Sequence, residues 1–162
     1  RLYVDGDFDS AQTLSFWFDL CRQRPDLHIY GYSKSWALFL EHNHNGNTFP
    51  ANYILNLSSG SKYENLPNYA SAMEKLKRED EEYLVRGYFV AVHIDCDGIP
   101  RGAKRYSVAE YHARVRQAAK EQYGTMALSC PGDCGNCPGA RQQCGLDRNS
   151  KKLVLIAIGV HG

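Results

Sequence analysis

The sequence predicts an α/β fold: a largely parallel sheet, or a partial (β/α) barrel, of about five strands with helices between them. Segments rich in β-branched and aromatic residues alternate with segments whose apolar residues have helical spacing. The last strand-like segment, residues 153–160, is continuously apolar, which is typical of a strand covered on both faces. The chain has 162 residues, 43% of them hydrophobic, so we expect a single domain over residues 1–162 with its own core.

Composition indicates where the strands lie. The expected strands are residues 2–4, 27–32, 53–57, 88–94 and 153–160. Because the chain begins with Arg1 and its first residues already have strand character, we expect further sequence upstream. The polar segment 42–50 predicts a solvated loop, although His42 and His44 within it have the His-x-His spacing of a metal-binding pair.

Helical spacing marks the segments between the strands. The expected helices begin near residue 10, cover 36–41 and 68–82, and run from 107 to 124. The first helix should be capped by Asp9 or Ser10. The last is the clearest, because Ser107 and Glu110 have the spacing of a capping box and Gly124 is a natural C-terminal stop.

Charge and hydropathy narrow the class of partner. The formal net charge is +1, from 19 basic and 18 acidic side chains, so no long-range attraction to nucleic acid or anionic membrane is expected. No apolar run approaches the roughly 18–20 residues of a membrane span, and no signal peptide is visible. We therefore expect a cytoplasmic protein without a membrane partner. An unknown small molecule, or a nucleic acid bound through a local basic patch, stays open as the partner, and the oligomeric state is not indicated.

The strongest chemical signal is a cysteine-rich loop at 129–145, just before the last strand. Its cysteines are Cys130, Cys134, Cys137 and Cys144. Clustering in a chain with its own α/β core favours a metal site over disulfides or unpaired thiols. Thiolates suit zinc or an iron–sulfur cluster. The first two spacings, of three and two intervening residues, favour a [4Fe–4S] cluster over zinc. Four cysteines would ligate every iron, which predicts a structural or electron-transferring role.

Polar side chains recur at the ends of the predicted strands. They are Asp5 and Asp7, Ser33 and Lys34, Ser58, Ser59 and Ser61, His93 and Asp95, and His161. In parallel α/β folds, ligands bind at the carboxyl ends of the strands. Any one of these residues is more often a cap or turn residue, but their recurrence at successive strand ends indicates a site. The candidates for a catalytic role are Asp7, Lys34, Ser58 and His93.

Several segments together resemble a family of uncharacterised phage and plasmid proteins. They are residues 4–8, 30–35 and 56–60 and the Cys-Pro-Gly-x-Cys-Gly-x-Cys loop. A more distant resemblance is to radical SAM partial barrels, in which an acidic motif after an early strand binds the amino group of S-adenosylmethionine. That resemblance implies S-adenosylmethionine as a cofactor, bound by Asp5, Gly6 and Asp7, with a first barrel strand and its cysteine loop upstream of Arg1.

Two hypotheses of function follow. The first is a radical-SAM-like enzyme, or its remnant, with a closed four-cysteine cluster and a substrate face at the strand ends. The second is a non-catalytic protein in which zinc staples the cysteine loop and presents basic residues to nucleic acid or a protein. Those residues are Arg141, Arg148, Lys151 and Lys152.

Overall fold

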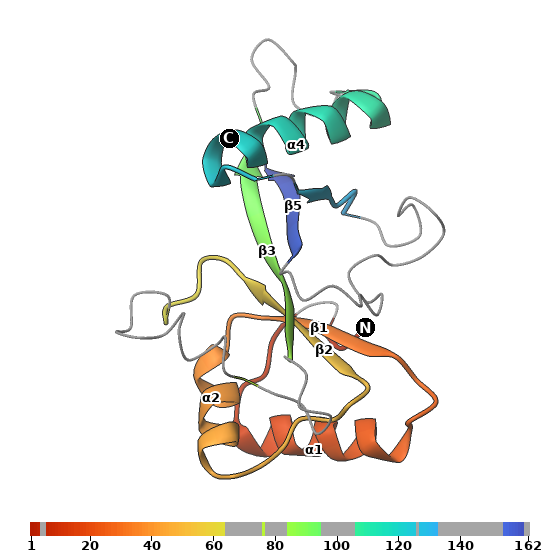
Figure 1. The fold of residues 1–162 in the computed structure, drawn as a ribbon, viewed down its shortest axis with the longest axis vertical. Helices are drawn as coiled ribbons and strands as arrows, with labels where there is room; N and C mark the ends of the chain where they lie inside the picture. Colours follow the sequence, from red (N-terminus) through yellow and green to blue (C-terminus); the bar gives the residue numbers. More distant parts are fainter. Residues whose placement is uncertain are drawn as a thin grey trace. The chain divides into compact units, whose positions relative to one another are not determined.

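The structure, a computed structural model, describes residues 1–3, 6–63, 76, 84–94, 106–125, 127–132 and 154–160. In these residues an all-parallel sheet has five strands in the order β1-β2-β3-β5-β4, with helices between strands (Figure 1). The strands are β1 (Ile29–Ser33), β2 (Tyr53–Ser58), β3 (Val85–His93), β4 (Leu128–Ser129) and β5 (Val154–Val160). The predicted fold class is confirmed.

The described helices are α1 (Ala11–Gln23), α2 (Trp36–His44) and α4 (Val108–Tyr123). The contacts divide the chain into two compact units, with the boundary inside β3 between Tyr88 and Phe89. The first unit holds α1, α2, β1 and β2, and the second holds α4, β4 and β5. The single domain expected from the sequence stays a prediction.

The first unit is built around buried aromatic rings. The Phe18 ring on α1 lies 6.1 Å from that of Phe39 on α2 and 5.2 Å from that of Tyr53 on β2. All three side chains are fully buried. Ser10 caps α1, as predicted, because its hydroxyl accepts the backbone N–H of Thr13. The core thus packs α1 and α2 against one face of β1 and β2.

The predicted first strand, residues 2–4, is reduced in the described residues to one parallel bridge between Leu2 and Gly31. Tyr3 interrupts the extended backbone with a φ of 52°, a conformation that non-glycine residues seldom adopt. Side-chain contacts hold it there: the Tyr3 hydroxyl accepts the Trp17 indole N–H at 3.1 Å, and its ring packs edge-on against Phe8 at 5.0 Å.

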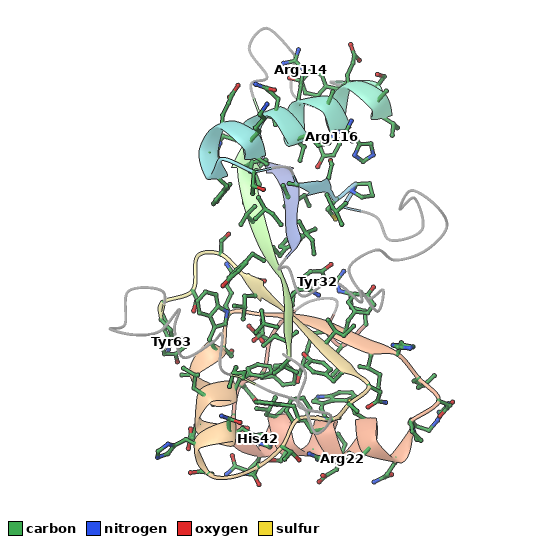
Figure 2. The ribbon with its side chains drawn as sticks, in the orientation of Figure 1. Arg22, Tyr32, His42, Tyr63, Arg114 and Arg116 are labelled. Atoms are coloured by element: carbon green, nitrogen blue, oxygen red, sulfur yellow. The ribbon has the colours of Figure 1, made fainter. Side chains whose placement is uncertain are left out.

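The predicted loop at 42–50 is wrong in its first residues, because α2 continues to His44. His42 is only 8% exposed, and its ring lies 5.2 Å from Phe18 and 5.4 Å from Phe49. Its Nε2 atom is 3.1 Å from the Thr48 carbonyl oxygen. Figure 2 places His42 on α2. His42 therefore belongs to the core of the first unit and not to a solvated metal-binding pair.

The burial of His42 predicts a pH-dependent stability of the first unit. Burial lowers the pKa of His42, and Arg22 lowers it further, while the Thr48 carbonyl and Asp19 oppose the shift. The unfolded chain therefore binds the proton more tightly than the native chain. This part of the stability is complete above the unfolded pKa of about 6.5 and falls as the pH drops from there toward the lower native pKa.

Urea unfolding between pH 7.5 and 5 measures this effect. His42→Gln should remove that part of the slope, whereas His44→Gln, on the exposed side of the same helix, should leave it unchanged. A slope that survives in His42→Gln would assign the pH dependence to other groups.

The second unit confirms the clearest predicted helix. The Ser107 hydroxyl accepts the Glu110 N–H at 3.2 Å, and the Glu110 carboxylate accepts the Ser107 N–H at 2.9 Å, which completes the capping box. Gly124 ends α4 in the left-handed conformation, with φ 68°. Val115 and Ala119 of this helix pack in a core with Val92 and Ala157. The predicted helix 68–82 lies outside the described residues, apart from Leu76.

Candidate functional site

Cys130, the first cysteine of the predicted metal loop, directly follows β4 at its carboxyl end. The Cys130 N–H donates to the Ala157 carbonyl at 2.7 Å, which continues the parallel pairing of β4 with β5. The Cys130 carbonyl accepts the hydroxyl of Tyr111, on α4, at 3.1 Å. The backbone of this cysteine is therefore fixed on both sides by the strand and the helix next to it.

The sulfur of Cys130 also accepts a hydrogen bond. Its donor is the backbone N–H of Gly132, two residues on, with a distance of 3.4 Å between nitrogen and sulfur. Gly132 has a φ of 81°, a left-handed conformation that favours glycine. A donor directed at sulfur stabilises the thiolate, which is the form that binds metals.

Two side chains of α4 contact Ser129 and Cys130, where the cysteine loop begins. The Tyr111 hydroxyl bridges the Cys130 carbonyl and the Gly159 N–H, at 3.1 and 3.0 Å. The next residue, His112, is 8% exposed and its Nδ1 atom lies 2.8 Å from the Ser129 hydroxyl. Burial lowers the pKa of His112, with a smaller effect from Arg116, which favours the neutral ring.

Cys134, Cys137 and Cys144 lie outside the described residues, and so do the basic residues of the second hypothesis: Arg141, Arg148, Lys151 and Lys152. Within the described part of the chain, no group of three or more His, Cys, Asp or Glu side chains could hold a metal ion. The four-cysteine site and its cofactor thus stay predictions, with the described geometry of Cys130 as their structural starting point.

Asp7 is held in a cage of donors from its own chain. Its Oδ1 atom accepts the Ser33 hydroxyl at 2.7 Å and the Phe8 N–H at 2.8 Å. Its Oδ2 atom accepts the N–H groups of Lys34 and Ser35, just before α2 begins. A carboxylate has about four lone-pair sites, so these four bonds use its capacity. The geometry favours a structural role for Asp7, as the joint between the N-terminal segment and β1.

Lys34 and Ser58 lie at the carboxyl ends of the neighbouring parallel strands β1 and β2. The Ser61 hydroxyl donates to the Lys34 carbonyl at 2.6 Å and joins the two loops that follow these strands. The structure therefore brings together Asp7, Ser33, Lys34 and the segment 58–61, as the parallel topology predicts.

The remaining predicted site residues are each described by themselves. Gly6 is exposed and has a φ of 88°. His93 ends β3 in the second unit, where it is exposed. Asp5, Asp95 and His161 lie outside the described residues.

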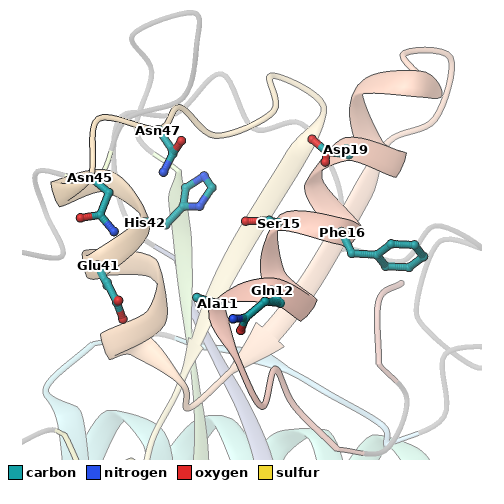
Figure 3. Close-up of a pocket in the computed structure, with 9 residues that line it drawn as sticks. All are labelled: Ala11, Gln12, Ser15, Phe16, Asp19, Glu41, His42, Asn45 and Asn47. Carbon is teal, nitrogen blue, oxygen red and sulfur yellow. The ribbon is translucent and has the colours of Figure 1, made fainter.

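An open groove of about 510 Å³ lies in the first unit between α1 and α2 (Figure 3). Ser15, Phe16 and Asp19 line it from α1, and Glu41 and His42 line it from α2. Asp19 is already paired with Arg22 at 3.2 Å. None of the predicted strand-end residues lines this groove, so it is separate from the strand-end group.

The sequence did not indicate the bond from Tyr111 to the Cys130 carbonyl, or the contact between His112 and Ser129, the residue before Cys130. The Tyr111 ring packs against the core of the second unit, but helical spacing does not reveal the partner of its hydroxyl. The useful signal was the polar end of a large aromatic side chain on an apolar helix face, since buried tyrosine hydroxyls usually find a partner.

A family model described as Gene product 88 matches residues 1–145 of the chain. The matched segment includes the four clustered cysteines and the strand ends of β1 and β2. No curated protein and no solved structure is detectably similar to the chain. None of the described helices has the length and apolar character needed to cross a membrane.

Proposed function

The chain belongs to the gene product 88 family, a phage-type family, and we propose that it binds a metal centre on Cys130, Cys134, Cys137 and Cys144. Family membership confirms the resemblance to phage proteins, whereas the resemblance to radical SAM proteins stays a prediction. The proposed centre is an iron–sulfur cluster, with zinc as the alternative. Its role is structural or electron-transferring, because four thiolates leave no iron open to a substrate.

One observation carries this proposal: the Cys130 sulfur accepts the Gly132 N–H in a glycine turn at the end of a parallel strand. Cys21, the other cysteine among the described residues, provides the contrast. Cys21 is 1% exposed in the core of the first unit, and burial raises its pKa to about 11. A neutral thiol of this kind is a packing residue, whereas the hydrogen bond to the Cys130 sulfur supports a role as a ligand.

S-adenosylmethionine is not part of the proposal. An acidic residue that binds the amino group of this cofactor must have an acceptor available, and the Asp7 carboxylate already accepts four hydrogen bonds from its own chain. The cysteine site does not depend on Asp7. Metal binding at the cysteines and S-adenosylmethionine binding at Asp7 can therefore be tested separately.

Alanine substitution of single cysteines tests the proposal. We expect Cys130→Ala, Cys134→Ala, Cys137→Ala and Cys144→Ala each to lower the iron and sulfide content of anaerobically purified protein at least about tenfold. Cys21→Ala is the control and should keep both, although it opens a small space in the core of the first unit. The measurement is iron, zinc and acid-labile sulfide per chain, with circular dichroism as the check on folding.

Equal metal content in the wild type and the four variants would overturn the proposal. A colourless protein that contains zinc, lost in the same four variants, would instead support the alternative of a zinc-stapled loop. That form would present Arg141, Arg148, Lys151 and Lys152 to nucleic acid or a protein, and its nucleic-acid affinity should then fall steeply with salt.

A further inference from the structure

The carboxyl ends of β1 and β2 carry a small cationic site that is distinct from the cysteine loop. Lys34 directly follows β1 and its side chain is exposed. Its ammonium nitrogen lies against the turn after β2, 3.4 Å from the point where a Cβ atom on Gly60 would stand. In the described residues no carboxylate lies within ion-pair distance of this ammonium. The positive charge is thus placed over a backbone turn without a counter-ion.

Ser58, the last residue of β2, adds a hydroxyl donor to this turn. The residue is 9% exposed, and no described group forms a hydrogen bond with its hydroxyl. A serine hydroxyl with no partner among the described groups can donate a hydrogen bond to a ligand. Leu57 packs in the core with α1 and α2, and side chains alternate along a strand, so Ser58 lies on the opposite face of the sheet.

The backbone turn at Gly60 lets a ligand come close to the main chain. Gly60 has a φ of 75°, and the absence of a side chain leaves room beside the Lys34 ammonium. The Ser61 hydroxyl bonds the Lys34 carbonyl at 2.6 Å, so the turn and the lysine are fixed to each other. A lysine point charge, a serine donor and a glycine turn at the carboxyl ends of parallel strands together suit a compact oxyanion.

We propose that Lys34, Ser58 and the Gly60 turn bind the phosphate group of a small molecule. Lys34 supplies the charge, the Ser58 hydroxyl donates a hydrogen bond, and Gly60 lets the phosphate approach the backbone. The Asp7 carboxylate is bound to the Lys34 and Ser35 N–H groups, and its negative charge nearby keeps the affinity moderate. We therefore expect a dissociation constant for inorganic phosphate of about 1 mM.

The test is a titration of the whole chain with inorganic phosphate at constant ionic strength, adjusted with sodium chloride. Amide chemical shifts of Gly60 and its neighbours report the binding. We expect saturable shifts in the wild type, and Lys34→Gln and Ser58→Ala should each weaken binding about tenfold, the effect of one charge-assisted or buried hydrogen bond. If Ser58→Ala does not fold, Ser58→Cys removes the same strong donor at nearly constant size.

Two control variants lie in the same loop. Lys62→Gln removes another exposed lysine, whose ammonium lies 5.0 Å from the Tyr63 ring centre, and Ser59→Ala removes a neighbouring hydroxyl. Both should bind phosphate within about twofold of the wild type. The absence of saturable shifts in the wild type up to about 50 mM phosphate would overturn the proposal. An equal loss of phosphate affinity in Lys62→Gln would also overturn the proposal, because it would show that phosphate is attracted by positive charge in general and not by a specific site.

Discussion

Asp7→Ala should lower the free energy of unfolding of the first unit by about 3 kcal/mol, because two or more bonds to a charged acceptor are lost and their donors stay partly buried. These donors are the Ser33 hydroxyl and the N–H groups of Phe8, Lys34 and Ser35. The chain's two tryptophans, Trp17 and Trp36, lie in this unit. Urea unfolding followed by tryptophan fluorescence therefore measures the change directly.

Asp9→Ala is the matched control for Asp7→Ala. Asp9 is an exposed carboxylate two residues away whose bond to the Ser10 hydroxyl is 3.3 Å long. Its removal should change stability by less than about 0.5 kcal/mol. A double-mutant cycle with Ser33→Ala should give a coupling energy of about 1 kcal/mol between Asp7 and Ser33. An Asp7→Ala protein as stable as the wild type would contradict the structural role and return Asp7 to the candidates for cofactor binding.

Gly31→Ala should destabilise the first unit by about 2–3 kcal/mol, since it overpacks a buried strand. A Cβ atom on Gly31 would stand 2.6 Å from the Tyr53 hydroxyl oxygen, and Tyr53 is fully buried. No described group bonds that hydroxyl, and burial raises its pKa well above the ordinary value, so it stays a neutral phenol. The hydroxyl therefore fills the space that the glycine leaves.

Tyr53→Phe supplies the control for Gly31→Ala. Alone it should change stability by less than about 1 kcal/mol, because it removes a buried hydroxyl that has no described partner. In the double variant the nearest atom to the new Cβ would be the ring carbon at 3.5 Å, an ordinary contact. We expect a coupling energy of at least about 1 kcal/mol in urea unfolding. Additive effects of the two substitutions would refute the proposed clash.

Local signals in the sequence predicted most of the described fold. The Ser107–Glu110 capping box, the Gly124 stop and the Ser10 cap are each set by neighbouring residues, and all three are confirmed. The alternation of strand and helix patterns along the chain predicted the parallel sheet. The strands near residues 27–32, 53–57, 88–94 and 153–160 were found with shifts of at most three residues at their ends.

The errors in the fold arose where tertiary contacts decide the structure. α2 extends to His44 because the His42 ring packs against Phe18 and Phe49, which lie outside this helix. The positions Trp36, Phe39 and His42 keep helical spacing, but histidine counted as polar. The two-residue strand β4 exists only by pairing with Ile156 and Ala157 of β5, which lie far along the chain.

The candidate site was predictable in its residue types and not in their roles. Parallel topology correctly placed Lys34 and Ser58 at neighbouring strand ends, and Asp7 bonds the Ser33 hydroxyl at the end of β1. It gave no indication that Asp7 accepts four bonds from its own chain, because that count depends on the positions of the Phe8, Lys34 and Ser35 amides. The hydrogen bond from the Tyr111 hydroxyl to the Cys130 carbonyl was equally unpredictable, since residue spacing indicates only that a ring packs in the core.

The metal centre is tested most directly by iron and acid-labile sulfide analysis of the whole chain, purified anaerobically, together with its absorption spectrum. The proposed cluster predicts a brown protein that absorbs near about 400 nm, with about four iron and about four sulfide per chain. A colourless protein with neither iron nor sulfide would contradict an iron–sulfur cluster, and one without zinc as well would contradict any metal on the four cysteines.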